Sequence, residues 1–99
     1  MNLTWRGPMR YFSSRDEKAF FQWVESIPGV VGVRGVGREL RIELRSARIS
    51  AETLRELIAL YRRYGGRLRD LAVFESASNR RWFRNPNAYW YRGVFGRSK

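Results

Sequence analysis

The residues of this 99-residue chain that can do chemistry are arginines, aromatics and a few carboxylates. There is no Cys and no His, which excludes thiolate nucleophiles, disulfides, cysteine metal sites and the commonest general base. The nine Asp and Glu residues are scattered along the sequence. We therefore expect a protein that is not an enzyme and has no metal site and no cofactor. A hydrolase or transferase built on a carboxylate pair is the weakest of the hypotheses that remain open.

Basic and aromatic residues gather in the C-terminal segment, residues 80–99. This segment has six bases and no acid, whereas residues 16–79 have eleven bases and nine acids. It also holds six aromatic residues: Trp82, Phe83, Tyr89, Trp90, Tyr91 and Phe95. Aromatics interleaved with Arg suit single-stranded nucleic acid, because bases stack on the rings and phosphates pair with guanidinium groups. The same residue types dominate the hot spots of protein–protein interfaces.

The formal net charge of +11 is concentrated at the two ends of the chain, and such asymmetry is typical of a protein with an acidic partner. The alternative is a basic surface that only keeps the protein soluble. We expect a small binding module in which nucleic acid is slightly favoured over an acidic protein. The alternative is a protein–protein interaction module, an adaptor or an immunity-type inhibitor, with a homodimer through a sheet edge as one possibility. The expected partner-binding residues are Arg80, Arg81, Arg84, Tyr89, Trp90 and Arg92.

The C-terminal segment is too aromatic for a disordered tail, so we expect it to dock on a domain formed by residues 1–79. Its rings either complete the core of that domain or stay exposed beside the arginines, and the sequence leaves both roles open. Asn85 followed by Pro86 predicts the start of a short helix that ends near Gly93.

Periodicity and capping residues predict six elements before this segment. Strand patterns cover 2–12, with a break at Gly7-Pro8, then 30–36, 40–45 and 68–75. A helix follows Ser14, taken as its N-cap in a capping box with Glu17, and ends before Pro28. A second helix follows Ser50 and stops at Gly65-Gly66.

The resulting order, β-α-β-β-α-β, resembles the ferredoxin-like arrangement over roughly residues 9–75. The resemblance implies an α+β two-layer sandwich, with an antiparallel sheet and two helices on one face. That fold includes the RNA recognition motif, which stacks bases on aromatics of its third strand. The corresponding residues 38–44 contain no aromatic residue, so we do not expect an RNA-stacking sheet here.

The expected core follows the apolar faces of these elements. It comprises Phe20, Trp23, Val24, Ile27, Val33, Leu40, Ile42, Leu44, Leu54, Leu57, Ile58, Tyr61, Leu71 and Val73. The first 25 residues are interrupted by charges and contain no apolar run, so we expect no signal peptide and no membrane partner. A cytoplasmic protein is the default expectation.

Overall fold

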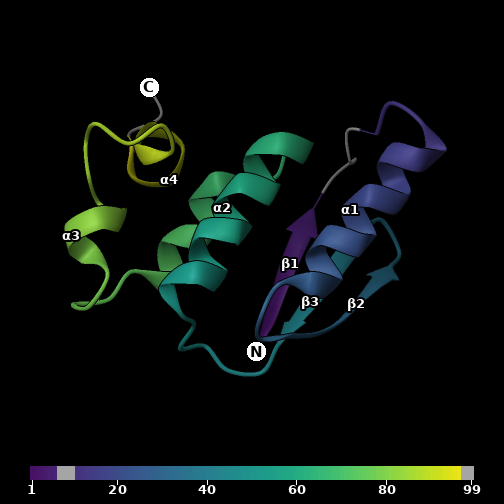
Figure 1. The fold of residues 1–99 in the computed structure, drawn as a ribbon, viewed down its shortest axis with the longest axis horizontal. Helices are drawn as coiled ribbons and strands as arrows, with labels where there is room; N and C mark the ends of the chain where they lie inside the picture. The colour runs from purple at the N-terminus through teal and green to yellow at the C-terminus, as the bar shows by residue number, and fades with distance from the viewer. Residues whose placement is uncertain (7–10, 97–99) are drawn as a thin grey trace.

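The computed structural model describes residues 1–6 and 11–96, which form a small α+β domain (Figure 1). Three strands make an antiparallel sheet in the order β1-β3-β2. The elements are, in chain order, β1 (Asn2–Arg6), α1 (Ser14–Ser26), β2 (Val30–Val36), β3 (Glu39–Leu44), α2 (Ala51–Tyr64), the 3-10 helix η1 (Leu68–Phe74), α3 (Arg80–Phe83) and α4 (Tyr91–Phe95).

The sheet separates an apolar face from a polar one, because successive side chains of a strand point to opposite faces. In β1, Leu3 and Trp5 are buried, and they pair in register with Ile42 and Leu40 of β3, which are also buried. The Trp5 ring contacts the ring of Phe20 in α1 and the ring of Tyr61 in α2, at centroid distances of 5.3 Å and 4.4 Å. Both long helices therefore pack on the same face of the sheet.

Local capping chemistry fixes the long helices, with one correction to the expected start of α1. Ser50 caps α2 as predicted, since its hydroxyl accepts a hydrogen bond from the Thr53 amide at 3.1 Å. The cap of α1 is Ser13 and not Ser14: the Ser13 hydroxyl accepts from the Asp16 amide at 3.1 Å, and the Asp16 carboxylate accepts from the Phe12 amide. The cap is thus displaced by one residue, and Asp16 takes the place of Glu17 but accepts from the amide of Phe12, the residue before the cap.

The predicted strand over 68–75 is wrong, because Leu68–Phe74 forms a 3-10 helix. Its apolar residues recur every third position, and Leu71 and Phe74 are buried while Leu68 is half-buried. A spacing of three places side chains on one face of a 3-10 helix, which has three residues per turn. Val73 lies off that face and is 65% exposed, which corrects its place in the expected core. The full ferredoxin-like order therefore lacks its fourth strand in the described residues.

The helix expected after Asn85 is also wrong, since the C-terminal segment forms the two short helices α3 and α4 instead. The Asn85 side chain accepts a hydrogen bond from the Asn87 amide at 2.9 Å, and its carbonyl accepts from Ala88. These bonds close a turn and not a helix. Gly93 lies inside α4, where a Cβ would approach the Leu68 side chain to 2.6 Å.

The hairpin of β2 and β3 around Gly37-Arg38 is confirmed. In the described residues the N-terminal strand is Asn2–Arg6, and the predicted break at Gly7-Pro8 lies outside them. Trp23 and Val33 are partly buried at the margin of the core and not within it. Buried apolar side chains outside the list of the expected core are Leu3, Trp5, Leu60, Tyr64, Phe74, Phe83 and Val94.

Candidate partner-binding surface

The C-terminal segment packs on η1 and α2, and α2 separates it from the sheet (Figure 1). Phe83 is 0% exposed and Val94 is 1% exposed, and both belong to the same core cluster as the residues of the sheet. Arg69 of η1 donates a hydrogen bond to the Gly96 carbonyl at 2.7 Å. The segment therefore has a buried side, and only its outer residues are available to a partner.

Two of the expected binding arginines are held by an internal carboxylate. Arg84 makes two hydrogen bonds to Glu75, at 2.6 Å and 2.9 Å, and Arg80 makes one at 3.1 Å. Hydrogen bonding from Arg84, supported by Arg80, lowers the pKa of the Glu75 carboxyl from 4.5 to about 2. Arg84 also lies 4.2 Å from the centre of the Phe95 ring. These two arginines tie the C-terminal segment to the end of η1, which reduces the positive charge that a partner would meet.

Arg81 and Arg92 differ from this pair. Both side chains are exposed, and neither forms an ion pair in the part of the chain that the structure describes. An exposed guanidinium without an internal carboxylate keeps its full capacity for an external anion.

Three aromatic rings of the C-terminal segment form a continuous group, here called the aromatic row: Trp82, Trp90 and Tyr89. Trp90 lies edge-on to both neighbours, with centroid distances of 6.0 Å to Trp82 and 5.0 Å to Tyr89. The Trp90 indole donates a hydrogen bond to the Phe83 carbonyl at 2.7 Å, which fixes the middle ring. Tyr89 is 55% exposed, whereas both tryptophans are partly buried. Tyr89 is thus the ring best placed to stack on a partner.

Helix α2 adds arginines that sequence reasoning did not select. The Arg55 guanidinium lies 4.1 Å from the centre of the Trp82 ring, a cation–π contact. The pKa of Tyr89 is raised, chiefly by partial burial. Arg62 of α2 opposes this shift electrostatically, and Glu56 of α2 adds to it. Arg55 and Arg62 are seven residues apart, two turns along the same side of the helix. That spacing was visible in the sequence, but nothing in it placed this side of α2 beside the C-terminal rings.

The outer face of the sheet carries charges of both signs and has no rings. Arg34 of β2 lies directly opposite Arg41 of β3, and Thr4 lies on the other side of Arg41. Arg6 at the same face is 3.6 Å from Glu39. In the described strands this face carries no aromatic side chain, so it offers no platform on which bases could stack.

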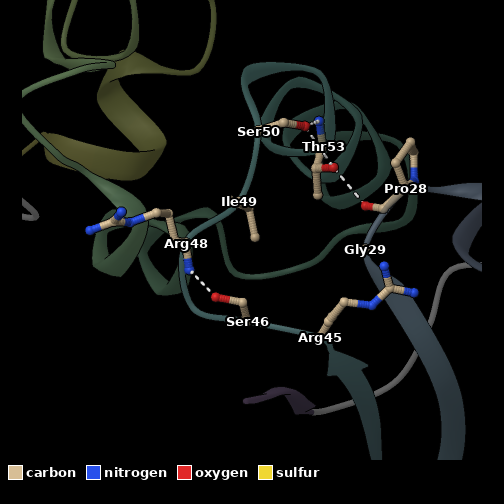
Figure 2. Close-up of a pocket in the computed structure, with 8 residues that line it drawn as sticks. All are labelled: Pro28, Gly29, Arg45, Ser46, Arg48, Ile49, Ser50 and Thr53. Carbon is tan, nitrogen blue, oxygen red and sulfur yellow. Dashed lines mark hydrogen bonds between the residues drawn. The ribbon is translucent and has the colours of Figure 1, made fainter.

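A small cavity of about 220 Å³ lies at the start of α2, and Figure 2 shows its lining residues. Its inner polar groups are already used, because Thr53 donates to the Pro28 carbonyl at 2.6 Å and accepts from Ser50 at 3.0 Å. Arg45 and Arg48 point away from each other at the rim (Figure 2). The cavity is smaller than ordinary ligand pockets and has no convergent charged groups.

No cluster of three or more Asp or Glu residues that could hold a metal ion occurs in residues 1–6 and 11–96. Within the same residues, no helix has the length and apolar character needed to cross a membrane. No family model matches the chain, and no curated protein or solved structure is significantly similar to it.

Proposed function

We propose that this protein is a non-enzymatic module that binds single-stranded nucleic acid through the aromatic row and the arginines beside it. The observation that carries the proposal is the cation–π contact between two separate elements: Arg55 of α2 lies over the ring of Trp82 in the C-terminal segment. Arg62, two turns further along α2, acts electrostatically on Tyr89. Arg81 adds an exposed charge on α3.

The chemistry of this surface suits a flexible, unpaired strand. A base can stack on the exposed Tyr89 ring, because every base has a π-face, and sequence matters little to such a contact. Phosphates on either side of the base can pair with guanidinium groups, which are planar and carry several donors.

An acidic protein is the second candidate, and one observation favours it. Glu75 neutralises part of the charge of Arg80 and Arg84, so the C-terminal segment presents less positive charge to a partner than its number of arginines suggests. A smaller surface with a few aromatic and Arg anchors is what a protein interface uses.

The test is titration of a labelled single-stranded oligonucleotide at several salt concentrations. If Arg55, Arg62, Arg81 and Arg92 each meet one phosphate, the log–log slope is about −3, since single strands contribute about 0.7 per contact. The double variant Arg55→Ala/Arg62→Ala is expected to flatten that slope by about 1.4.

The same titration distinguishes the contribution of base stacking from that of charge, because only charged contacts change the salt dependence of binding. Tyr89→Ala is expected to weaken binding by about 1–3 kcal/mol without changing the slope, because stacking releases no counterions. Phe12→Ala is the matched aromatic control, since Phe12 is 85% exposed on a different part of the molecule. Arg38→Ala, in the β2–β3 turn, is the matched charge control. Absence of binding at low salt, or equal losses in Phe12→Ala and Tyr89→Ala, would leave the acidic protein as the better candidate.

A further inference from the structure

Strand β2 forms one edge of the sheet, and its outward backbone groups can be identified. Leu44 of β3 exchanges backbone hydrogen bonds with Met1, at 2.7 Å and 3.0 Å, so its backbone faces β1. Orientation alternates along a strand, and Glu43, Arg41 and Glu39 therefore face β2. Their register partners in β2 are Gly32, Arg34 and Val36, and the backbone groups of these three residues face β3. The residues between those partners, Val33 and Gly35, consequently direct their N–H and C=O groups away from the sheet.

Nothing in the described residues covers this edge. No backbone hydrogen bond from Val33 or Gly35 to another element is present in residues 1–6 and 11–96. The strand carries a single charge, Arg34, and its Val31 and Val36 side chains are 50% and 38% exposed. Natural edge strands are usually protected by Pro, Lys, shortness or a β-bulge. This seven-residue strand has no Pro and no Lys, and its one irregularity lies at its start, between Val30 and Gly32.

We propose that β2 pairs antiparallel with β2 of a second copy of this chain, with Val33 opposite Val33 of the partner. The two three-stranded sheets then join into one continuous sheet about a twofold axis. This arrangement is an isologous dimer, in which the same strand supplies both halves of the interface.

Charge complementarity selects this occupant and this register. With Val33 on the axis, Arg34 comes opposite the partner's Gly32, on the outer face of the sheet. Gly32 lies beside Glu43 in its own sheet, and a Cβ on Gly32 would be 3.8 Å from the Glu43 carboxylate. Because Gly32 has no side chain, Arg34 can extend across it toward the partner's Glu43, about two strand spacings or 10 Å away between backbones. The twofold axis makes this ion pair twice.

The neighbouring registers are less favourable. Sliding one strand by two residues in one direction places Arg34 opposite the partner's Arg34, and like charges directly opposite destabilise a sheet. Sliding it in the other direction moves Arg34 opposite the partner's Val30, away from Glu43. In the single chain Arg34 already lies opposite Arg41, so an acidic neighbour on its other side relieves a repulsion that the fold contains.

The experiment is sedimentation of the full-length protein over a range of concentrations. The wild type is expected to approach twice the single-chain mass of 11.8 kDa as concentration rises. Arg34→Glu and Glu43→Arg each turn two attractive contacts into repulsive ones, so each is expected to raise the dimer Kd by at least about tenfold. The double variant Arg34→Glu/Glu43→Arg restores opposite charges and is expected to recover the wild-type Kd.

Two further variants distinguish β2 from the rest of the molecule. Gly35→Pro removes an outward N–H and is expected to abolish the dimer, whereas Thr4→Pro does the same at the β1 edge and is expected to leave it intact. Arg67→Glu, exposed and remote from β2, controls for net charge. Thermal melts show that each variant is folded. A protein that remains a monomer at its highest soluble concentration, or a double variant no better than the singles, would overturn the proposal.

Discussion

Replacing Glu75 with Gln tests the attachment of the C-terminal segment most directly. In the wild type, the carboxylate accepts hydrogen bonds from Arg84 and Arg80 at the start of this segment. A neutral amide keeps the shape of the side chain and loses the charge. The variant is therefore expected to weaken the docking of α3 without creating a cavity.

The size of the effect follows from the pKa of Glu75, which falls from 4.5 to about 2 through hydrogen bonding from Arg84. A difference of this size between the unfolded and folded states corresponds to at most about 3 kcal/mol. The Arg80 and Arg84 side chains are 60% and 45% exposed, and solvent screening reduces the stabilisation to about 1 kcal/mol. Because the folded pKa is the lower one, this stabilisation is present above pH 4.5 and is lost as the pH falls toward 2.

Urea unfolding at pH 7 and at stepwise lower pH measures this difference. At pH 7 Glu75→Gln is expected to be about 1 kcal/mol less stable than the wild type, and the two proteins are expected to converge near pH 2. Glu25→Gln, on the exposed side of α1, is the matched control and is expected to change little. The reasoning is refuted if Glu75→Gln matches the wild type at pH 7, or if its deficit persists unchanged at pH 2.

Three further predictions concern packing and capping. Phe83→Ala is expected to cost about 3–5 kcal/mol in urea unfolding, because this ring is 0% exposed; an unaffected midpoint would mean that the C-terminal segment does not complete the core. Ser50→Ala is expected to cost about 1 kcal/mol through loss of the α2 cap, whereas Ser14→Ala, which caps nothing, should change the melting temperature little; equal losses would contradict the assigned caps. Gly66→Ala is expected to cost about 1–3 kcal/mol, because its Cβ would lie 2.6 Å from the Tyr61 ring; a melting curve like that of the wild type would show that the ring can move aside.

Several elements could be predicted from the sequence because their causes are local. Helix α2 begins after Ser50, whose hydroxyl accepts a hydrogen bond from a free amide of the first turn. It ends at Gly65, which adopts the left-handed conformation at φ +81°. The alternation of apolar and charged residues from 39 to 44 fixes which face of β3 is buried. For the rings of the C-terminal segment, composition could not decide between burial in the core and exposure beside the arginines. The structure shows that Tyr89 is exposed.

The character of residues 68–75 and the layout of the candidate surface depended on tertiary contacts. A short apolar run fits a buried strand or a buried helix equally well, and packing of Leu71 and Phe74 against the core decides in favour of the 3-10 helix. The fate of each C-terminal arginine was equally non-local. Arg84 is held because docking brings Glu75 to it, and Arg55 joins the aromatic row across 27 residues of sequence. Composition determined that the chain would be basic and aromatic, but only the docked fold decided which of those charges stay open to a partner, since ion pairing depends on distances that the sequence does not specify.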